Sequence, residues 1–277
     1  MTKEKLTPFV KWAGGKKQLL DKLKARLPKS YNKYYEPFIG GGALLLALQP
    51  EHAVINDVNE QLLNIYRQLK EAPEVVINAV NILDTTPCDS TRYMTTRALF
   101  NAKITSHELS AQCAALMIWI NKHCFNGLYR VNSKGAFNVP FNNRTTGMSI
   151  AADNLRNIGQ YLKTNDIEIR QGDFELACAD AQPGDLVYFD SPYVPASETA
   201  NFTDYTKEGF TLHDHKRLAS LFRELSQRGV LLMLSNNDVP LIHELYDGFR
   251  IGQIDARRAI NRDATKRHGQ EVIITNY

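Results

Sequence analysis

Leu186-Val187-Tyr188-Phe189, followed by Asp190-Ser191-Pro192-Tyr193, is the stretch that decides the fold. The first four residues are an apolar run, which is typical of a buried strand in a parallel sheet, and the run ends in a carboxylate. In open α/β sheets, ligands bind at the carboxyl ends of such strands. The stretch therefore predicts an α/β fold with a functional site directly after this strand.

The four residues after the strand suit one class of substrate. A carboxylate and a carbonyl held in place by the next proline offer two acceptors for N–H groups, and the tyrosine offers a face for stacking. This combination favours a planar base with an exocyclic amine, such as adenine, over a sugar or a peptide. Taken alone, the tetrapeptide is more often a simple turn that ends a strand, because Asp and Ser-Pro are ordinary turn residues.

A glycine-rich turn near the N-terminus is the second motif. Residues 35–42 end an extended segment with three glycines, and the apolar helical run Ala43–Leu48 follows. Such a turn lets a ligand approach the backbone closely. The next apolar segment, residues 53–57, ends in an acid whose spacing from the glycines matches that of the ribose-binding acid in dinucleotide folds. The pair of features favours a nucleoside-bearing cofactor over a plain strand-to-helix connection.

Residues 9–16 contain lysine and glycine but do not form a nucleotide-triphosphate loop. The glycine spacing is wrong, and Lys17 stands where Ser or Thr would bind magnesium. We exclude a nucleotide-triphosphate enzyme on this ground.

Several separated blocks of the sequence resemble the Dam family of DNA adenine-N6 methyltransferases. The blocks are residues 11–16, 36–42, 56–57, 125–130, 137–141 and 190–193. Their order is that of the alpha-type amino-methyltransferases, with the cofactor motif first, a target-recognition region in the middle and the catalytic tetrapeptide late, and the match runs nearly end to end. The resemblance implies a Rossmann-like methyltransferase sheet, S-adenosyl-L-methionine as methyl donor and double-stranded DNA containing GATC as substrate.

The resemblance also implies a set of cofactor-binding residues. Asp57 looks like the acceptor of the ribose hydroxyls. Asp173 follows the alternating segment 167–170 and looks like the acceptor of the cofactor's adenine amino group, although without the resemblance an acid in a solvated turn is the simpler reading. The other residues of this set are Trp12, Ala13, Gly14, Lys16, Phe38, Gly40, Gly42, Phe174 and Asp190.

Asp190, Ser191, Pro192 and Tyr193 are the predicted catalytic residues. The family usually has Asp-Pro-Pro-Tyr, so Ser191 is a departure; serine keeps the backbone carbonyl that this position contributes but loses some rigidity. We expect the Asp190 carboxylate and the Ser191 carbonyl to accept the amino hydrogens of a flipped adenine that stacks on Tyr193. Positioning and charge stabilisation then carry the acceleration, without a metal or a covalent intermediate.

The sequence predicts three functional segments. Residues 1–58 form the N-terminal part of the catalytic domain with the cofactor site, and residues 151–277 form its C-terminal part with the tetrapeptide. Residues 59–150 are a mostly helical target-recognition domain, because there the alternation of strands and helices gives way to helical patterns.

A β-hairpin is predicted within the recognition domain. Asn132-Ser133-Lys134-Gly135 marks a turn between residues 128–131 and 136–139. A hairpin of this size fits the major groove of DNA.

The resemblance assigns DNA contacts to this region. Arg130 looks like the donor of two bonds to a guanine edge, Asn126 like a phosphate contact, and Phe125 like an aromatic wedge in the base stack. The other predicted DNA-binding residues are Lys11, Leu128, Asn132 and Pro140. Without the resemblance, Arg130 is a surface arginine and Phe125 a plug between helix and hairpin. Residues 141–144 depart from the family's usual Gly-Arg-Tyr, which leaves the outer bases of the recognition sequence open.

Two polar segments have open interpretations. Arg257, Arg258, Arg262, Lys266 and Arg267 fall between two apolar strands, in a loop that either grips phosphates or is a solvated connection. Residues 195–205 are polar and aromatic, as expected either of a lid over the flipped base or of an ordinary surface loop.

The amino-acid composition excludes only a few classes of protein. The chain has 277 residues and a net charge of +3, which alone is no argument for nucleic acid. Cys88, Cys113, Cys124 and Cys178 lack paired spacing, so we expect buried small hydrophobes rather than disulfides or a zinc site. No hydrophobic run approaches membrane-spanning length and the N-terminus lacks a signal peptide's apolar segment, so we expect a cytoplasmic protein.

Other functions remain as alternatives. A cytosine-N4 methyltransferase favours Ser at the first motif position, where this chain has Asp190, and an RNA methyltransferase fits the recognition region less well. A catalytically decayed DNA-binding module, marked by Ser191, and an adenine-N6 methyltransferase with another recognition sequence stay open. So does the biological role, including a cognate restriction endonuclease that acts on the same sequence.

Overall fold

The chain folds into two compact units, each assembled from separate stretches of sequence. The computed structural model describes residues 4–144, 147–195, 209–257 and 268–277. The first unit consists of Met1–Gly15, Ile39–Glu51 and Asp57–Gln171, and the second of Lys16–Phe38, His52–Asn56 and Gly172–Tyr277.

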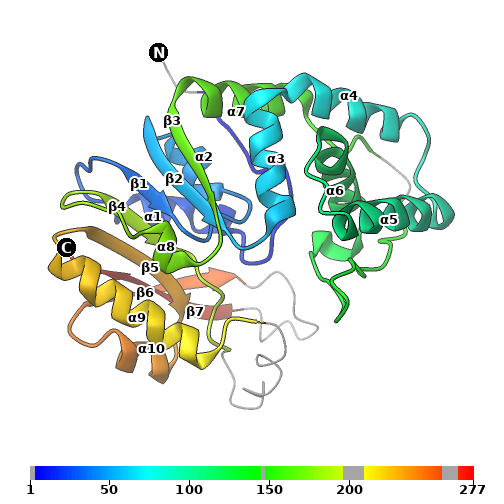
Figure 1. The fold of residues 1–277 in the computed structure, drawn as a ribbon. Helices are drawn as coiled ribbons and strands as arrows, with labels where there is room; N and C mark the ends of the chain where they lie inside the picture. Colours follow the sequence, from blue (N-terminus) through cyan, green and yellow to red (C-terminus); the bar gives the residue numbers. More distant parts are fainter. Residues whose placement is uncertain (1–3, 145–146, 196–208, 258–267) are drawn as a thin grey trace. The chain divides into compact units, whose positions relative to one another are not determined.

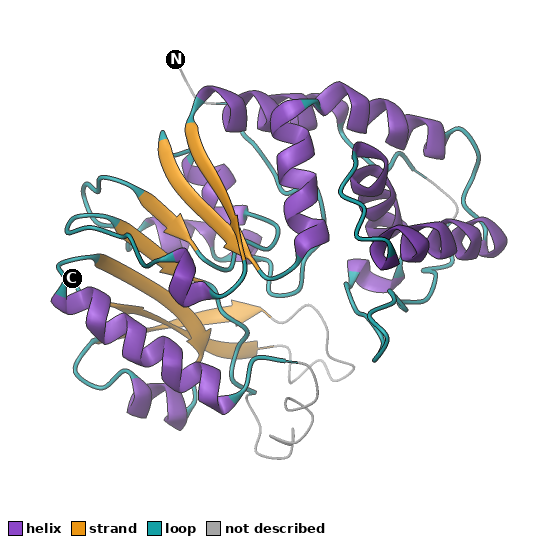
Figure 2. Cartoon of the chain, viewed as in Figure 1, coloured by secondary structure: helices purple, strands orange, loops and turns teal. Residues whose placement is uncertain are grey.

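Strands and helices alternate at both ends of the chain, whereas consecutive helices fill its middle (Figures 1 and 2). In chain order the elements are η1 (Lys16–Gln18), α1 (Leu20–Lys24), β1 (Tyr34–Glu36), α2 (Ala43–Leu48), β2 (His52–Asp57), α3 (Glu60–Glu71), α4 (Pro73–Asp84), α5 (Ser90–Thr105), α6 (Ala111–His123), η2 (Phe125–Gly127), α7 (Ala152–Thr164), β3 (Asp166–Gln171), α8 (Phe174–Ala177), β4 (Leu186–Phe189), α9 (Leu212–Gln227), β5 (Leu231–Asn237), α10 (Pro240–Leu245), β6 (Arg250–Arg257) and β7 (His268–Thr275).

The strands form a seven-stranded sheet with the order β3-β2-β1-β4-β5-β7-β6. β1 pairs in parallel with β2 and β4, and β4 pairs in parallel with β5. β7 is antiparallel to both of its neighbours, β5 and β6. A largely parallel sheet with helical connections confirms the predicted α/β class with a Rossmann-like sheet.

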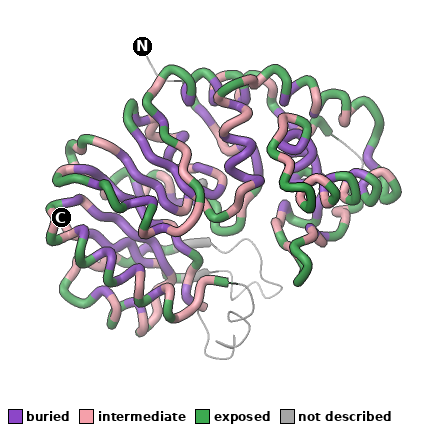
Figure 3. The backbone as a smooth tube through the Cα atoms, viewed as in Figure 1, coloured by how far each residue is buried: buried purple, intermediate pink, exposed green. Residues whose placement is uncertain are grey.

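The core of the second unit explains why the strand that decides the fold is apolar without alternation. All four residues of β4 are fully buried, and the middle of β5 is buried as well (Figure 3). Strands that are covered on both faces read as continuous apolar runs. α9 buries one face, including Leu218, Phe222 and Leu225, in the same cluster as Val187 and Leu232.

The first unit holds the run of helices α3 to α6, where the sequence predicts mostly helical structure. α3, α5 and α6 begin at side chains that cap their first turns: Asn59, Asp89 and Ser110 each accept a hydrogen bond from a backbone N–H three residues on. α6 is buried over most of its length and packs against α3, α4 and α5. Its apolar character on all sides follows from this central position.

The predicted hairpin is present, but its strands are short. The pairing consists of isolated bridges, Val131 with Phe137 and Cys124 with Phe141. The Oδ1 atom of Asn132 accepts hydrogen bonds from the N–H groups of Lys134 and Ala136, at 2.9 and 3.0 Å. An Asn side chain that accepts these hydrogen bonds stabilises the turn locally, so few backbone hydrogen bonds between the two strands are needed.

Among the described residues, no helix combines the length and the apolar character that a bilayer crossing requires. Over the same residues, His, Cys, Asp and Glu side chains form no group that suits a metal ion. All four cysteines are buried, as the sequence predicts.

Candidate active site

Asp190 follows the last residue of β4 and forms an ion pair with a buried lysine. Its Oδ1 atom lies 2.6 Å from Nζ of Lys16, whose side chain is 5 % exposed, and 3.1 Å from the Oγ of Ser235, which donates to it. Burial raises the pKa of Asp190 above its ordinary value, while Lys16 and Ser235 act in the opposite direction. The carboxylate is therefore a partly buried acceptor whose charge the lysine compensates.

Tyr193 is held at both its ring and its hydroxyl. Nζ of Lys16 lies 4.4 Å from the ring centroid, and the hydroxyl donates to Oε2 of Glu271 at 3.0 Å. Burial raises the pKa of the phenol well above its usual value, so the hydroxyl stays protonated. A base that stacks on this ring either displaces the ammonium group or uses the opposite face.

The end of β5 fixes the backbone on both sides of the tetrapeptide. Asn236 accepts from the N–H of Val194 at 2.9 Å, and the side-chain amide of Asn237 donates to the carbonyl of Val194. Ser235 bonds Asp190, as described above, and also the buried hydroxyl of Tyr188 at 2.9 Å. Sequence reasoning missed these three residues. The available signal was a run of polar side chains at the carboxyl end of an apolar strand.

Ser191 is buried at 2 % exposure, and its Oγ lacks a hydrogen-bond partner within the part of the chain that the structure describes. Pro192, next to it, is exposed. The hydroxyl that distinguishes this chain's tetrapeptide is thus not needed for the local hydrogen bonding.

An aromatic cluster in the second unit surrounds Phe174. The ring of Phe174 lies 5.4 Å from Phe38 and 5.7 Å from Phe210, and Phe38 and Phe210 lie 5.6 Å apart. Asp173 caps α8 through the N–H of Glu175 at 2.9 Å and pairs with Arg217, also at 2.9 Å. Three of the predicted cofactor residues, Phe38, Asp173 and Phe174, therefore lie together here.

In the first unit, Asp57 binds the glycine turn. Its Oδ2 accepts from the N–H of Gly40 at 3.0 Å, and its Oδ1 accepts from the N–H of Asn59 at 2.9 Å. Burial raises the pKa of Asp57, and these backbone bonds lower it. Gly42, at φ +67°, starts α2 in a left-handed conformation, and a Cβ there would collide with the hydroxyl of Tyr66.

Trp12 links this turn to the hairpin. A Cβ on Gly40 would lie only 2.8 Å from Cδ1 of the indole, so the ring rests directly on the glycine. The indole also stacks on the ring of Tyr129, with the ring centroids 5.4 Å apart. Ala13 and Gly14, which follow Trp12, are exposed.

The predicted base-reading arginine lies on the exposed side of the hairpin. The Nε atom of Arg130 donates to Oδ1 of Asn138 at 2.7 Å. Asn126 is exposed with φ 56°, and Phe125 is 51 % exposed, which argues against the plug interpretation of Phe125.

The other predicted DNA contacts lie close by within the first unit. The backbone of Lys11 is fixed by Asn121, which accepts from its N–H at 2.8 Å, while its side chain is exposed. Pro140 is exposed, Leu128 is half-buried, and the side chain of Asn132 belongs to the turn.

Some predicted features lie outside the described residues. They are the basic residues Arg258, Arg262, Lys266 and Arg267, the side chain of Arg257, and residues 196–205 of the polar segment after the tetrapeptide.

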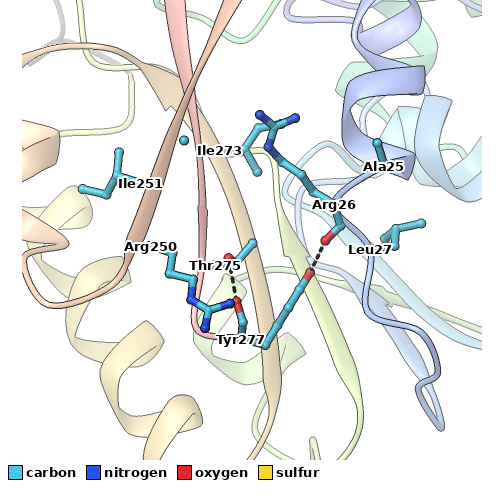
Figure 4. Close-up of a pocket in the computed structure, with 9 residues that line it drawn as sticks. Ala25, Arg26, Leu27, Arg250, Ile251, Ile273, Thr275 and Tyr277 are labelled. Carbon is cyan, nitrogen blue, oxygen red and sulfur yellow. Dashed lines mark hydrogen bonds between the residues drawn. The ribbon is translucent and has the colours of Figure 1, made fainter.

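A pocket of about 370 Å³ in the second unit contains none of the predicted site residues (Figure 4). It is lined by Arg26 of the segment after α1 and by residues of β6 and β7. Arg250 pairs with Thr275 in register, at the end of β7 that lies away from Glu271. The pocket is therefore at the opposite strand ends from the tetrapeptide.

Comparison with known proteins gives consistent matches over nearly the whole chain. Residues 12–260 match the family described as D12 class N6 adenine-specific DNA methyltransferase. The chain is 43 % identical to the Type II methyltransferase M1.LlaDCHI of Lactococcus lactis subsp. cremoris, over 98 % of this chain and 96 % of that protein. It is 38 % identical to the Type II methyltransferase M.MjaIII of Methanocaldococcus jannaschii, over 98 % and 99 % of the two chains. With the DNA adenine methylase of Escherichia coli K12 it shares 30 % identity, over 97 % and 94 %.

Proposed function

The chain belongs to the D12 class of N6 adenine-specific DNA methyltransferases, and from that premise we propose that it methylates adenine within GATC after flipping the base out of the duplex. Its reaction is the transfer of a methyl group to N6 of adenine in DNA, with S-adenosyl-L-methionine as the donor. The recognition sequence, the flipped base and the residue roles are the proposal. The observation that carries the chemistry is the partly buried Asp190 acceptor beside the ring of Tyr193, directly after β4.

The chemistry requires a site of this kind. The amino nitrogen of adenine is a poor nucleophile because its lone pair is delocalised, and in a duplex it is also paired and stacked, so the base must leave the helix. The Asp190 carboxylate and the Ser191 carbonyl accept its two N–H groups and localise the lone pair on nitrogen, while Tyr193 stacks on the ring. The amino group takes the place of Lys16 at Oδ1 of Asp190.

The residues present suit S-adenosyl-L-methionine, which supplies an electrophilic methyl group. In the first unit, Asp57 offers carboxylate lone pairs for ribose hydroxyls beside the glycine turn, whose Gly40 N–H it already binds. In the second unit, Asp173 and the rings of Phe38 and Phe174 offer an acceptor and stacking surfaces for an adenine. We propose each of these residues as a cofactor contact, and with them Trp12, Ala13, Gly14, Lys16 and Asp190.

Methyl transfer to matched duplexes tests the proposal. One duplex contains GATC and the others carry single substitutions, with tritiated cofactor as donor and the modified nucleoside identified by mass spectrometry. N6-methyladenine confined to GATC supports the proposal, and N6-methyladenine at another sequence overturns the specificity. An enzyme that binds the cofactor but transfers nothing to any duplex favours the decayed-module alternative.

Asp190→Ala tests the catalytic assignment. We expect a loss of at least about a hundredfold in turnover, because the acceptor of the amino hydrogen is gone, with cofactor affinity largely retained. Asp21→Ala is the matched control, since Asp21 is an exposed acid of α1 in the same unit. Methylation that persists in Asp190→Ala contradicts the assignment.

Arg130→Ala tests the hairpin. Loss of a two-bond contact to guanine lowers discrimination at one base pair by about 1–3 kcal/mol, whereas loss of a phosphate contact weakens all sequences alike. Asn126→Ala, at the proposed phosphate contact, is the comparison. If Arg130→Ala weakens binding to all sequences equally, Arg130 does not read a base.

We also propose the assignment of the segments. Residues 59–150 act as the target-recognition domain, and residues 1–58 and 151–277 as the two parts of the catalytic domain. Two relatives carry the name Type II methyltransferase, which supports a role in restriction-modification. A restriction endonuclease that cuts the same sequence is then the proposed functional partner, with no direct contact implied.

A further inference from the structure

Glu271, on β7, lies outside every motif that the sequence revealed, yet it contacts the tetrapeptide. We infer that it is a positioning residue, which tethers the hydroxyl of Tyr193 and so holds the ring ready for the flipped adenine. The inference rests on the proposed function, because it requires the base to stack on Tyr193.

The strand order explains how Glu271 reaches the site. β7 lies next to β5, and the register sets Glu271 opposite Asn237, the last residue of β5. Asn237 in turn bonds the carbonyl of Val194. Two adjacent strand positions therefore hold two consecutive residues: Asn237 the backbone of Val194, and Glu271 the side chain of Tyr193 at 3.0 Å.

The chemistry of the pair suits a tether. The raised pKa of Tyr193 keeps its hydroxyl protonated, so it donates, and a carboxylate is a pure acceptor. Hydrogen bonds to an ionised partner are roughly twice as strong as neutral ones. Asp190 is already paired with Lys16 and Ser235, which leaves Glu271 as an acceptor that does not compete for the catalytic carboxylate.

The tether matters most when the base arrives. Before that, the ammonium group of Lys16 lies against the Tyr193 ring and neutralises Asp190. When the adenine amino group takes the place of Lys16 at Asp190, this contact with the ring is lost or weakened. The bond between Tyr193 and Glu271 involves neither the base nor Asp190, so it persists and keeps the ring in one position through the reaction.

Glu271→Leu and Glu271→Gln separate the tether from a merely structural role. Leucine has similar bulk but no acceptor, and we expect turnover to fall about tenfold with cofactor affinity unchanged. Glutamine keeps an acceptor oxygen and should restore most of the activity. Gln270→Leu is the control, because it changes the neighbouring exposed residue of the same strand. Urea unfolding of each variant checks that β7 is intact.

A duplex with 2-aminopurine at the target adenine provides a readout independent of methyl transfer. A flipped base that stacks on a fixed ring is quenched, so Glu271→Leu should give a brighter complex than the parent, Glu271→Gln or Gln270→Leu. In the background of Tyr193→Phe, which already lacks the hydroxyl, Glu271→Leu should cause no further loss.

The outcomes distinguish this inference from the proposed function. A parent enzyme that does not flip or methylate any duplex removes the proposed function itself. With an active parent, unchanged turnover and fluorescence in Glu271→Leu overturn the tether. So does a Glu271→Gln variant as impaired as Glu271→Leu, or an additive loss in the double variant with Tyr193→Phe.

Discussion

Asp190 is subject to two opposing effects that set the pH at which it works. Burial raises its pKa, and the ammonium group of Lys16 at 2.6 Å lowers it. Because the folded pKa lies above that of an exposed aspartate, protonation sets in at a higher pH than usual. Methylation that needs the carboxylate is then lost as pH falls through this raised pKa. The burial cost of the charge is present above that pKa and is relieved below it.

Lys16→Met should therefore move the acidic limb of the kcat/KM profile to higher pH. The kcat/KM profile reports the free enzyme, in which Lys16 still pairs with Asp190. The measurement is methyl transfer at subsaturating DNA, followed from neutral pH down through the acidic limb of both enzymes. If the acidic limb of Lys16→Met lies at the same pH as that of the parent, the ion pair with Lys16 does not determine the pKa of Asp190.

Ser191 is the residue at which the tetrapeptide departs from the family's usual sequence. We expect Ser191→Pro to leave turnover within about tenfold of the parent, roughly 1.4 kcal/mol in barrier, because both residues supply the same backbone carbonyl. A far larger rise in turnover would identify Ser191 as the mark of a decayed site.

Ser191→Ala tests the buried hydroxyl separately. Its Oγ lacks a partner within the described residues, so its removal relieves a desolvation cost. The free energy of unfolding should stay the same or rise by up to about 1 kcal/mol in urea titrations. A clear destabilisation shows that the hydroxyl makes a favourable interaction.

At the scale of elements, the start of α2 depends on a glycine that no other residue replaces. Gly42 adopts φ +67°, and a Cβ there would meet the hydroxyl of Tyr66, which bonds the carbonyl of Gly40 at 3.0 Å. We expect Gly42→Ala to lower the free energy of unfolding by at least about 1 kcal/mol and to weaken cofactor binding.

Gly41→Ala is its matched control. Gly41 does not have a positive φ, and a Cβ there would find its nearest atoms at an ordinary 3.6 Å. Its unfolding free energy should change by less than about 0.5 kcal/mol. Equal losses of unfolding free energy in Gly42→Ala and Gly41→Ala would show that the turn tolerates alanine at neither position. The positive φ of Gly42 would then not be the cause of the destabilisation.

The sequence predicts those parts of the site that are local in the chain. The strand before Asp190, the glycine turn and the hairpin turn are each determined by residues that are neighbours in the chain. Their sequence patterns therefore predict them. Ser235, Asn236 and Glu271 reach the tetrapeptide only because β5 lies beside β4 and β7 beside β5. Tyr193 and Glu271 are 78 residues apart, and no local pattern relates them.

The hairpin shows a second limit of local patterns. Alternation over residues 128–139 predicts two strands, yet isolated bridges suffice, because the Asn132 side chain supplies the bonds that close the turn. A side-chain pattern locates a turn reliably. It is a poorer guide to the number of residues that pair on either side of the turn.

At the scale of the whole molecule, β7 joins two strands that precede it in the chain. It lies between β5 and β6 and is antiparallel to both. We expect a chain that ends at Arg257 to leave both strands with unpaired edges and to aggregate or lose the second unit's cooperative unfolding. Solubility and a thermal scan of this fragment, with and without the peptide of residues 268–277, provide the check. A soluble fragment that methylates DNA would contradict the need for β7.

The position of β7 has a consequence for how the protein is made. On the ribosome, β5 and β6 emerge before the strand that connects them, so this half of the sheet cannot be completed while the chain is still growing through residue 257. The strand that completes the sheet also carries Glu271, and it brings Tyr193 its hydrogen-bond partner in the same event. Nascent chains therefore gain the completed sheet and the hydrogen bond between Tyr193 and Glu271 together, and a chain that stops at residue 257 has neither.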